Sequence, residues 1–174
     1  MGGMGTTTAE RQHTAVPRSH ARVGYAAAAT AFAFALVSFY WGAGGTAGLD
    51  TLGGTLEQDA LARDPAIVAL VWSTGVLKLA GGVLALALVR PWGRHFPRRA
   101  MAVAAWGGAA LLTLYGVTQT GLVTFMWLGW YDTPQQQLSA SELRWRMLLW
   151  EPWFLLWGVL LGLAAWQHRR RTRH

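Results

Sequence analysis

The stretch PAIVALVWSTGVLKLAGGVLALALV, residues 65–89, decides the class of this protein. Lys78 is the one charged residue in it. A bilayer's hydrocarbon core is about 30 Å thick, and an α-helix needs about 20 residues to cross it. A segment this long and this apolar therefore predicts a transmembrane helix.

Three more apolar segments follow the same pattern, which predicts an all-α, polytopic membrane protein built as a four-helix transmembrane bundle. The four spans cover about 23–41, 65–89, 100–120 and 145–166, inside a transmembrane domain of 23–166. Residues 1–22 are polar and predict a disordered cytoplasmic tail, and 167–174 predict a basic cytoplasmic tail. A cleaved signal peptide over the first apolar segment is the competing interpretation, because basic residues precede it.

The composition agrees with a membrane location. Of 174 residues, 53% are hydrophobic and 13% are charged, whereas soluble domains carry roughly 25% charged residues. The chain has no cysteine, which excludes disulfides and thiolate-bound metals. All five histidines lie outside the predicted spans, which excludes haem or metal held by histidine within the bundle. We therefore predict no cofactor, no metal and no catalytic residue.

The basic residues are distributed unevenly along the chain. Eleven of the 15 fall in the two tails and the 90–99 turn: Arg11, Arg18, Arg22, Arg90, Arg94, Arg98, Arg99, Arg169, Arg170, Arg171 and Arg173. The positive-inside rule then predicts a cell (inner) membrane protein with both termini in the cytoplasm. Contact with anionic membrane lipids explains the arginine-rich ends, so no nucleic-acid partner is needed.

Two charged residues lie in the interior of predicted spans, away from the span ends, and such residues are functional candidates by default. They are Lys78 and Glu151. At 1.5 Å per residue, Ser38, Tyr115 and Thr74 fall at a similar depth in the outer half. These five form a candidate intramembrane polar site, and we expect the two charges to share one network. The site is either a hydrogen-bonded layer that fixes helix packing, or a ligand, lipid or ion site.

Local signals predict how the helices pack. Gly82 and Gly158 lie on small-residue faces, so each is expected to contact another helix of the same chain. Ser139 with Glu142 fits a capping box at the start of the fourth helix. Pro152 removes an amide donor within that helix, which predicts a kink.

Eleven tryptophans need an explanation as well. Interfacial belts at both membrane surfaces account for most of them. The excess on the predicted outer side supports an alternative, an aromatic-walled cavity. Its candidate members form an outer aromatic cluster: Trp41, Trp72, Trp150 and Trp153.

Three strings carry a family resemblance: YWGAGG at 40–45 followed by GLD at 48–50, RPWGR at 90–94, and WEPWFL at 150–155. Together they resemble the actinobacterial four-helix membrane family known as domain of unknown function 3995. The KLAGG stretch at 78–82 is also weakly similar to DoxX-type membrane proteins. The resemblance implies the four-helix architecture and assigns no activity.

Three functions stay open on these grounds. The first is a binding or accessory protein for a membrane lipid, a small lipophilic ligand or a protein partner. The second is a small proton-coupled transporter that uses Glu151 and Lys78. The third, a lipid-modifying enzyme, ranks last because the outer half lacks a catalytic constellation. The oligomeric state does not follow from the sequence.

Overall fold

The computed structural model describes residues 18–130 and 138–171, which are helical with short connections and contain no strand. The long helices are α1 (Arg18–Gly42), α3 (Pro65–Val89), α4 (Arg98–Trp127) and α6 (Glu151–Arg171). The shorter elements are η1 (Leu49–Thr51), α2 (Gly54–Leu61), η2 (Pro91–His95), α5 (Ala140–Trp145) and the π-helical turn η3 (Arg146–Trp150). Four helical stretches are long and apolar enough to cross a membrane, the last running through α5, η3 and α6. The predicted all-α fold is therefore confirmed.

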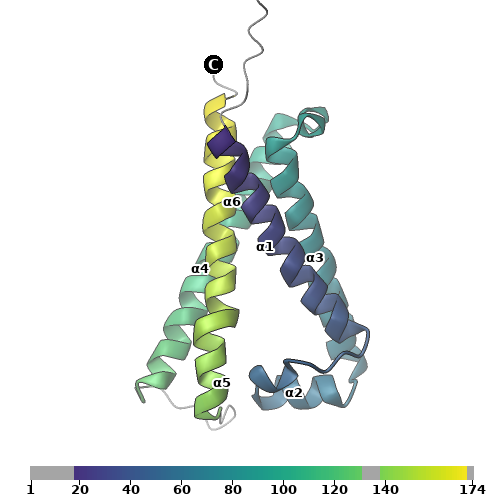
Figure 1. The fold of residues 1–174 in the computed structure, drawn as a ribbon, viewed down its shortest axis with the longest axis vertical. Coiled ribbons are helices and arrows are strands. Elements are labelled where there is room, and N and C mark those ends of the chain that lie inside the picture. Colours follow the sequence, from purple (N-terminus) through teal and green to yellow (C-terminus); the bar gives the residue numbers. More distant parts are fainter. Residues whose placement is uncertain (1–17, 131–137, 172–174) are drawn as a thin grey trace, which may run out of the picture.

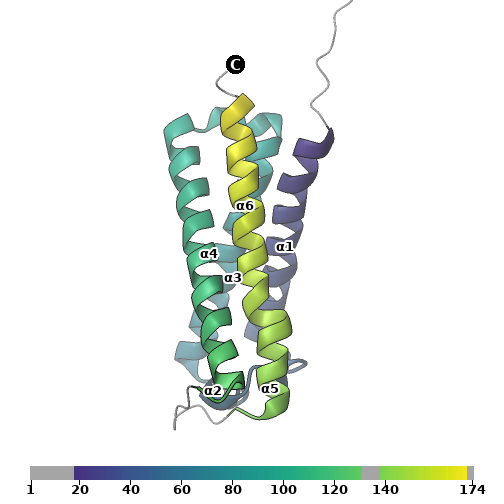
Figure 2. The ribbon, with the colours of Figure 1, turned by 90° about the vertical axis from the view of Figure 1, so that its left-hand side faces the viewer.

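The bundle consists of two helix pairs. Helix α1 packs along α3, α4 packs along α6, and contacts between α1 and α6 join the pairs. Figure 1 shows the pairs meeting where α1 begins and α6 ends, which we call the terminal end. They spread apart toward the distal end (Figure 1), where α2 and α5 lie (Figure 2). The molecule thus has a closed half and an open half.

The core of the terminal half is built mainly from alanine. Its buried members are Ala27, Ala28, Ala85, Ala87, Leu88, Met101, Ala105, Ala109, Leu161, Ala164 and Ala165. Small side chains let helix backbones approach closely, which is the usual basis of helix association in membranes. The pairs therefore come together where the sequence is richest in small buried residues.

Both predicted glycine contacts are confirmed. A Cβ on Gly82 would lie 2.4 Å from the Phe32 ring of α1, and one on Gly158 would lie 2.6 Å from the Thr113 backbone nitrogen of α4. Each glycine thus allows one of the two close pairings, α1 with α3 or α4 with α6.

The last span begins with the predicted capping box. The Ser139 hydroxyl accepts from the Glu142 amide, and the Glu142 carboxylate accepts from the Ser139 amide. Directly before Pro152, where a kink was predicted, lies the π turn η3, in which the Glu151 amide donates to the carbonyl of Arg146, five residues back. Short π turns of this kind occur as local irregularities inside α-helices.

Several helix boundaries differ from the predicted ones, since α4 runs to Trp127 and α6 to Arg171, beyond the predicted spans that end at 120 and 166. Helix α1 begins at Arg18, so residues 18–22 are helical and not disordered. Once a helix has nucleated in the span, each added residue gains one hydrogen bond, and the helix extends past the apolar segment. Residues 1–17 and 172–174 lie outside the described part of the chain.

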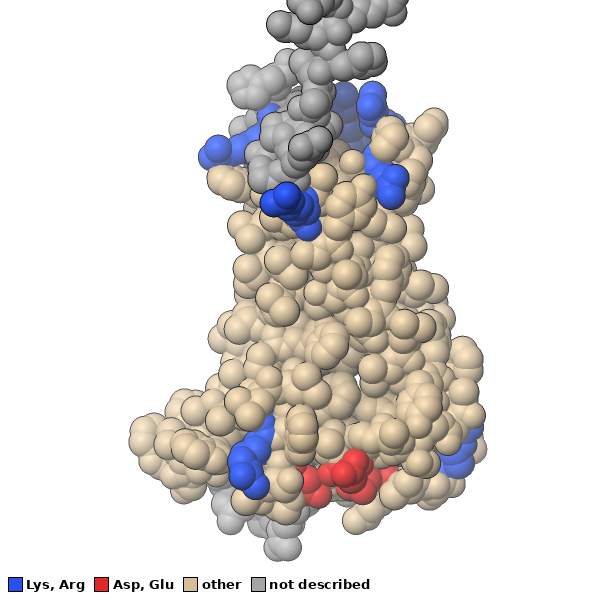
Figure 3. All heavy atoms as spheres, in the orientation of Figure 1, with Lys and Arg blue, Asp and Glu red and all other residues tan. Residues whose placement is uncertain are grey.

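Charge is distributed differently at the two ends. On the face shown in Figure 3, basic side chains gather at the terminal end, whereas at the distal end the acidic side chains lie together with basic side chains on either side. The long surface between them is free of charge on this face, as expected for a wall facing lipid.

Candidate functional site

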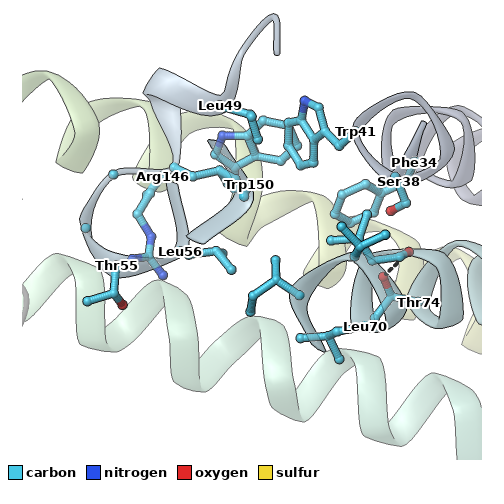
Figure 4. A pocket seen from close by; sticks show the side chains of 18 of the residues that line it. Phe34, Ser38, Trp41, Leu49, Thr55, Leu56, Leu70, Thr74, Arg146 and Trp150 are labelled. Carbon is cyan, nitrogen blue, oxygen red and sulfur yellow. Dashed lines mark hydrogen bonds between the residues drawn. The ribbon is translucent and has the colours of Figure 1, made fainter. Parts of the chain in front are cut away.

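A cavity of about 350 Å³ lies between the two helix pairs in the open, distal half. Small-molecule sites typically measure 300–1,000 Å³. All five residues of the predicted polar site line this cavity: Ser38, Thr74, Lys78, Tyr115 and Glu151. Figure 4 shows Ser38, Phe34 and Thr74 on one side of it, with Arg146, Thr55 and Leu56 on the other. The structure thus brings together side chains from α1, α2, α3, α4, η3 and α6.

Lys78 is held by neutral groups. Its Nζ donates to Ser38 Oγ at 2.7 Å and lies 3.7 Å from the centroid of the Phe34 ring. The Phe154 ring centroid lies 5.9 Å away. Ammonium groups over aromatic faces are stabilised by the ring quadrupole, more strongly where water is excluded. The ammonium therefore has a hydroxyl and two rings as neighbours.

Glu151 is almost fully buried, with 3% of its surface exposed. Its Oε1 accepts from Arg146 Nε at 3.2 Å and from Nη2 at 3.0 Å. A buried carboxylate is rarely found without a partner, because removing a charge from water is costly. The partner of Glu151 is thus Arg146, while Lys78 turns to Ser38.

The role of Arg146 was missed at the sequence level for a geometric reason. On a regular α-helix, residues five apart point about 140° away from each other, so they do not pair. The π turn η3 lies between Arg146 and Glu151 and changes that relation. The signal that could have pointed to an irregular helix here is Pro152, because a proline inside a helix removes one backbone hydrogen bond and disturbs the preceding turn.

The remaining polar residues play smaller parts. Thr74 Oγ1 donates to the Val71 carbonyl of its own helix. The Tyr115 ring of α4 meets the Phe154 ring of α6 edge to face, at 4.8 Å between centroids. Tyr115 thereby brings α4 into the wall of the cavity.

Two tryptophans of the predicted outer aromatic cluster line the cavity, Trp41 and Trp150, with ring centroids 5.1 Å apart. Trp150 Nε1 donates to Thr51 Oγ1 at 3.0 Å, which ties α6 and η3 to the η1 loop. Phe34, which drew no attention in the sequence, lies between Trp150 and the Lys78 ammonium.

The other two tryptophans of the predicted cluster, Trp153 and Trp72, contact different parts of the protein. Trp153 contacts the Phe34 ring at 5.4 Å, and its Nε1 donates to the Thr30 carbonyl of α1. Trp72 packs against Phe39 at 5.3 Å and closes over Gly42. Neither lines the cavity. The four tryptophans therefore do not form one cluster.

Arg63 also lines the cavity, although the sequence assigned it no role in the site. It has a positive φ of 56°, and its guanidinium donates to the carbonyls of Trp41 and Gly42 at 3.2 and 3.1 Å. Basic side chains stabilise the carbonyl end of a helix in this way, here the end of α1. With Lys78 and Arg146 it gives the lining three basic residues against the single carboxylate of Glu151, a formal sum of +2.

Among the described residues, no group of three or more histidine, aspartate or glutamate side chains is placed to hold a metal ion.

A family model described as a protein of unknown function, DUF3995, matches residues 31–161. The chain belongs to the DUF3995 family. The DUF3995 region contains every residue that lines the cavity, from Phe34 to Phe154. No curated protein and no solved structure matches this chain.

Proposed function

We propose that this DUF3995 protein binds a small amphipathic ligand in its distal cavity. The observation that carries the proposal is a cavity of about 350 Å³ between apolar helices, with Lys78 and the Arg146–Glu151 pair on its walls. Apolar walls with a few placed polar groups are the usual make-up of small-molecule sites.

A purely structural polar layer explains the same residues less well. Such a layer fixes helices by direct side-chain contact, and protein interiors close-pack with few voids larger than a water molecule. Here the polar groups surround an open volume where the helix pairs spread apart (Figure 1). The spacing of the pairs supports ligand binding.

Native mass spectrometry of the purified protein tests the proposal. The wild type should retain bound small molecules, and Thr74→Trp should lose them because the indole would fill the cavity from α3. Val76→Trp is the matched control, since Val76 is 55% exposed and lies outside the cavity. Equal occupancy in all three proteins would place any ligand elsewhere.

The orientation proposed here puts the termini in the cytoplasm and the cavity in the outer half of the membrane. The arginine-rich terminal end supports it (Figure 3). In a chain without native cysteine, Thr55→Cys should react with an impermeant thiol reagent on intact cells, and Thr172→Cys should not. The opposite result would reverse the topology.

Proton-coupled transport is the second candidate, because Glu151 and Lys78 both line the cavity. It requires Glu151 to leave Arg146 during each cycle, since a carrier carboxylate must exchange its proton. Flux of a bound ligand in proteoliposomes that responds to a proton gradient would favour transport. Binding without such flux supports the binding protein.

A further inference from the structure

We infer that the ligand of this cavity carries an anionic oxygen head group on an acyl tail, and that the head binds the Lys78 ammonium. The inference rests on the proposed binding function and names the chemistry of its ligand. A fatty-acid carboxylate and the phosphate of an anionic lipid share this chemistry.

The charges of the lining point to an anion. Glu151 is matched by Arg146, and Arg63 is engaged by the carbonyls at the end of α1. Lys78 differs from both, because its contacts are the Ser38 hydroxyl and two phenyl rings. A cation inside a span is costly, and an oxyanion within hydrogen-bond distance would offset that cost.

The number of N–H donors on Lys78 also supports an anionic oxygen ligand. An ammonium has three N–H donors. Among the described residues, Ser38 is the acceptor found for Lys78, so one donor is used there. Lys78 also lines the cavity, which places its remaining donors next to the open volume. A head group with two or more oxygens can take both.

An apolar tail has a route out of the cavity. Leu70 of α3 and Tyr115 of α4 both line the cavity, and they are 53% and 43% exposed. The cavity is therefore not sealed beside these two helices, and we place the exit of the tail between α3 and α4. A tail leaving there enters hydrocarbon directly, while the head stays at Lys78.

Ligands that differ only in head group test the inference. The full chain in phosphatidylcholine nanodiscs is titrated with dodecanoate and with dodecanol, with empty nanodiscs as the blank. Dodecanoate should bind about tenfold more tightly, as expected for one charge-assisted hydrogen-bonded contact. Equal affinity for dodecanol would overturn the anionic head group and leave the proposed binding function standing. Failure of both to bind, by contrast, would count against the binding function itself.

Variants assign the head group to Lys78. Lys78→Met should bring dodecanoate down to the affinity of dodecanol, and Lys78→Arg should keep the preference. Arg144→Met is the matched control, because Arg144 is a distal arginine that does not line the cavity. Retained dodecanol binding shows that Lys78→Met is folded. A preference that survives Lys78→Met would overturn the assignment.

A lipid arm identifies the source of the head group. Nanodiscs that contain phosphatidylglycerol are compared with phosphatidylcholine alone, and retained lipid is counted by native mass spectrometry. Enrichment of phosphatidylglycerol that depends on Lys78 supports the inference with a phospholipid as ligand. Lys78-dependent dodecanoate binding without that enrichment supports it with a free fatty acid. Absence of Lys78 dependence in both arms would contradict it.

Discussion

The terminal half and the distal half of the bundle are built from the same four helices but from different side chains. Alanines such as Ala27, Ala85, Ala105 and Ala164 fill the terminal core. In the distal half many of the residues that face the cavity are large or charged, among them Trp150. Small residues let helices meet, whereas large and charged ones hold them apart. The difference teaches that side-chain size along each helix sets where the bundle closes and where it opens.

Breaking the ion pair of the open half should have the largest effect. Glu151→Gln leaves the Arg146 guanidinium without its carboxylate and should lower the free energy of unfolding by about 3 kcal/mol. Because the two residues act together, Arg146→Met combined with Glu151→Gln should cost less than the sum of the single changes. Thermal unfolding in detergent measures each variant.

A second cycle, with Lys78→Met in place of Arg146→Met, should show weaker coupling to Glu151, since Lys78 contacts Ser38 instead. Coupling stronger than that of Arg146 would mean that Lys78 is the true partner of the carboxylate.

Disrupting the close contact between α4 and α6 should have the second-largest effect. In Gly158→Leu the new side chain meets the Thr113 backbone, which cannot rotate away, so we expect a loss of about 2–3 kcal/mol. Gly107→Leu is the control, because a Cβ there has no neighbour within 4 Å. Similar melting temperatures for the two variants would refute the close contact at Gly158.

Loosening the distal cover of the cavity should have the smallest effect. Trp150→Phe keeps most of the ring packing and removes the hydrogen bond from Nε1 to Thr51 Oγ1. The loss should be about 1 kcal/mol, the usual net value of one such bond. Thr51→Val should cost more, because it also removes the hydrogen bond from Thr51 Oγ1 to the Gly48 carbonyl, and the double variant should cost little more than Thr51→Val alone. Additive losses would show that the bond does not form.

The depth of each residue along its helix could be predicted from the sequence, because the bilayer requires every span to have a similar length and an apolar surface. The segment 65–89 coincides with α3, whose start is fixed by Asp64, which caps the Ala66 and Ile67 amides. The polar residues placed at one depth line one cavity for the same reason.

The direction in which each side chain points from its helix axis could not be predicted. Depth does not say which way a side chain faces, so Trp72 was grouped with Trp150 although it packs against Phe39 instead. The Arg146–Glu151 pair was hidden for a related reason, since a local π turn changes the angular relation of residues five apart. Phe34 resembles any apolar residue of a span until the neighbouring helices show that it lies under Lys78.

The central claim is that the distal half encloses an accessible cavity while the terminal half is closed. Because the chain has no cysteine, one introduced thiol reports one position. Thr74→Cys lies on the cavity wall, and Ala85→Cys replaces a residue of the closed core that is 0% exposed. Measured with N-ethylmaleimide on the folded protein, Thr74→Cys is predicted to react, with dodecanoate slowing the reaction, and Ala85→Cys is predicted to stay unmodified. Equal reactivity at the two positions would contradict the account.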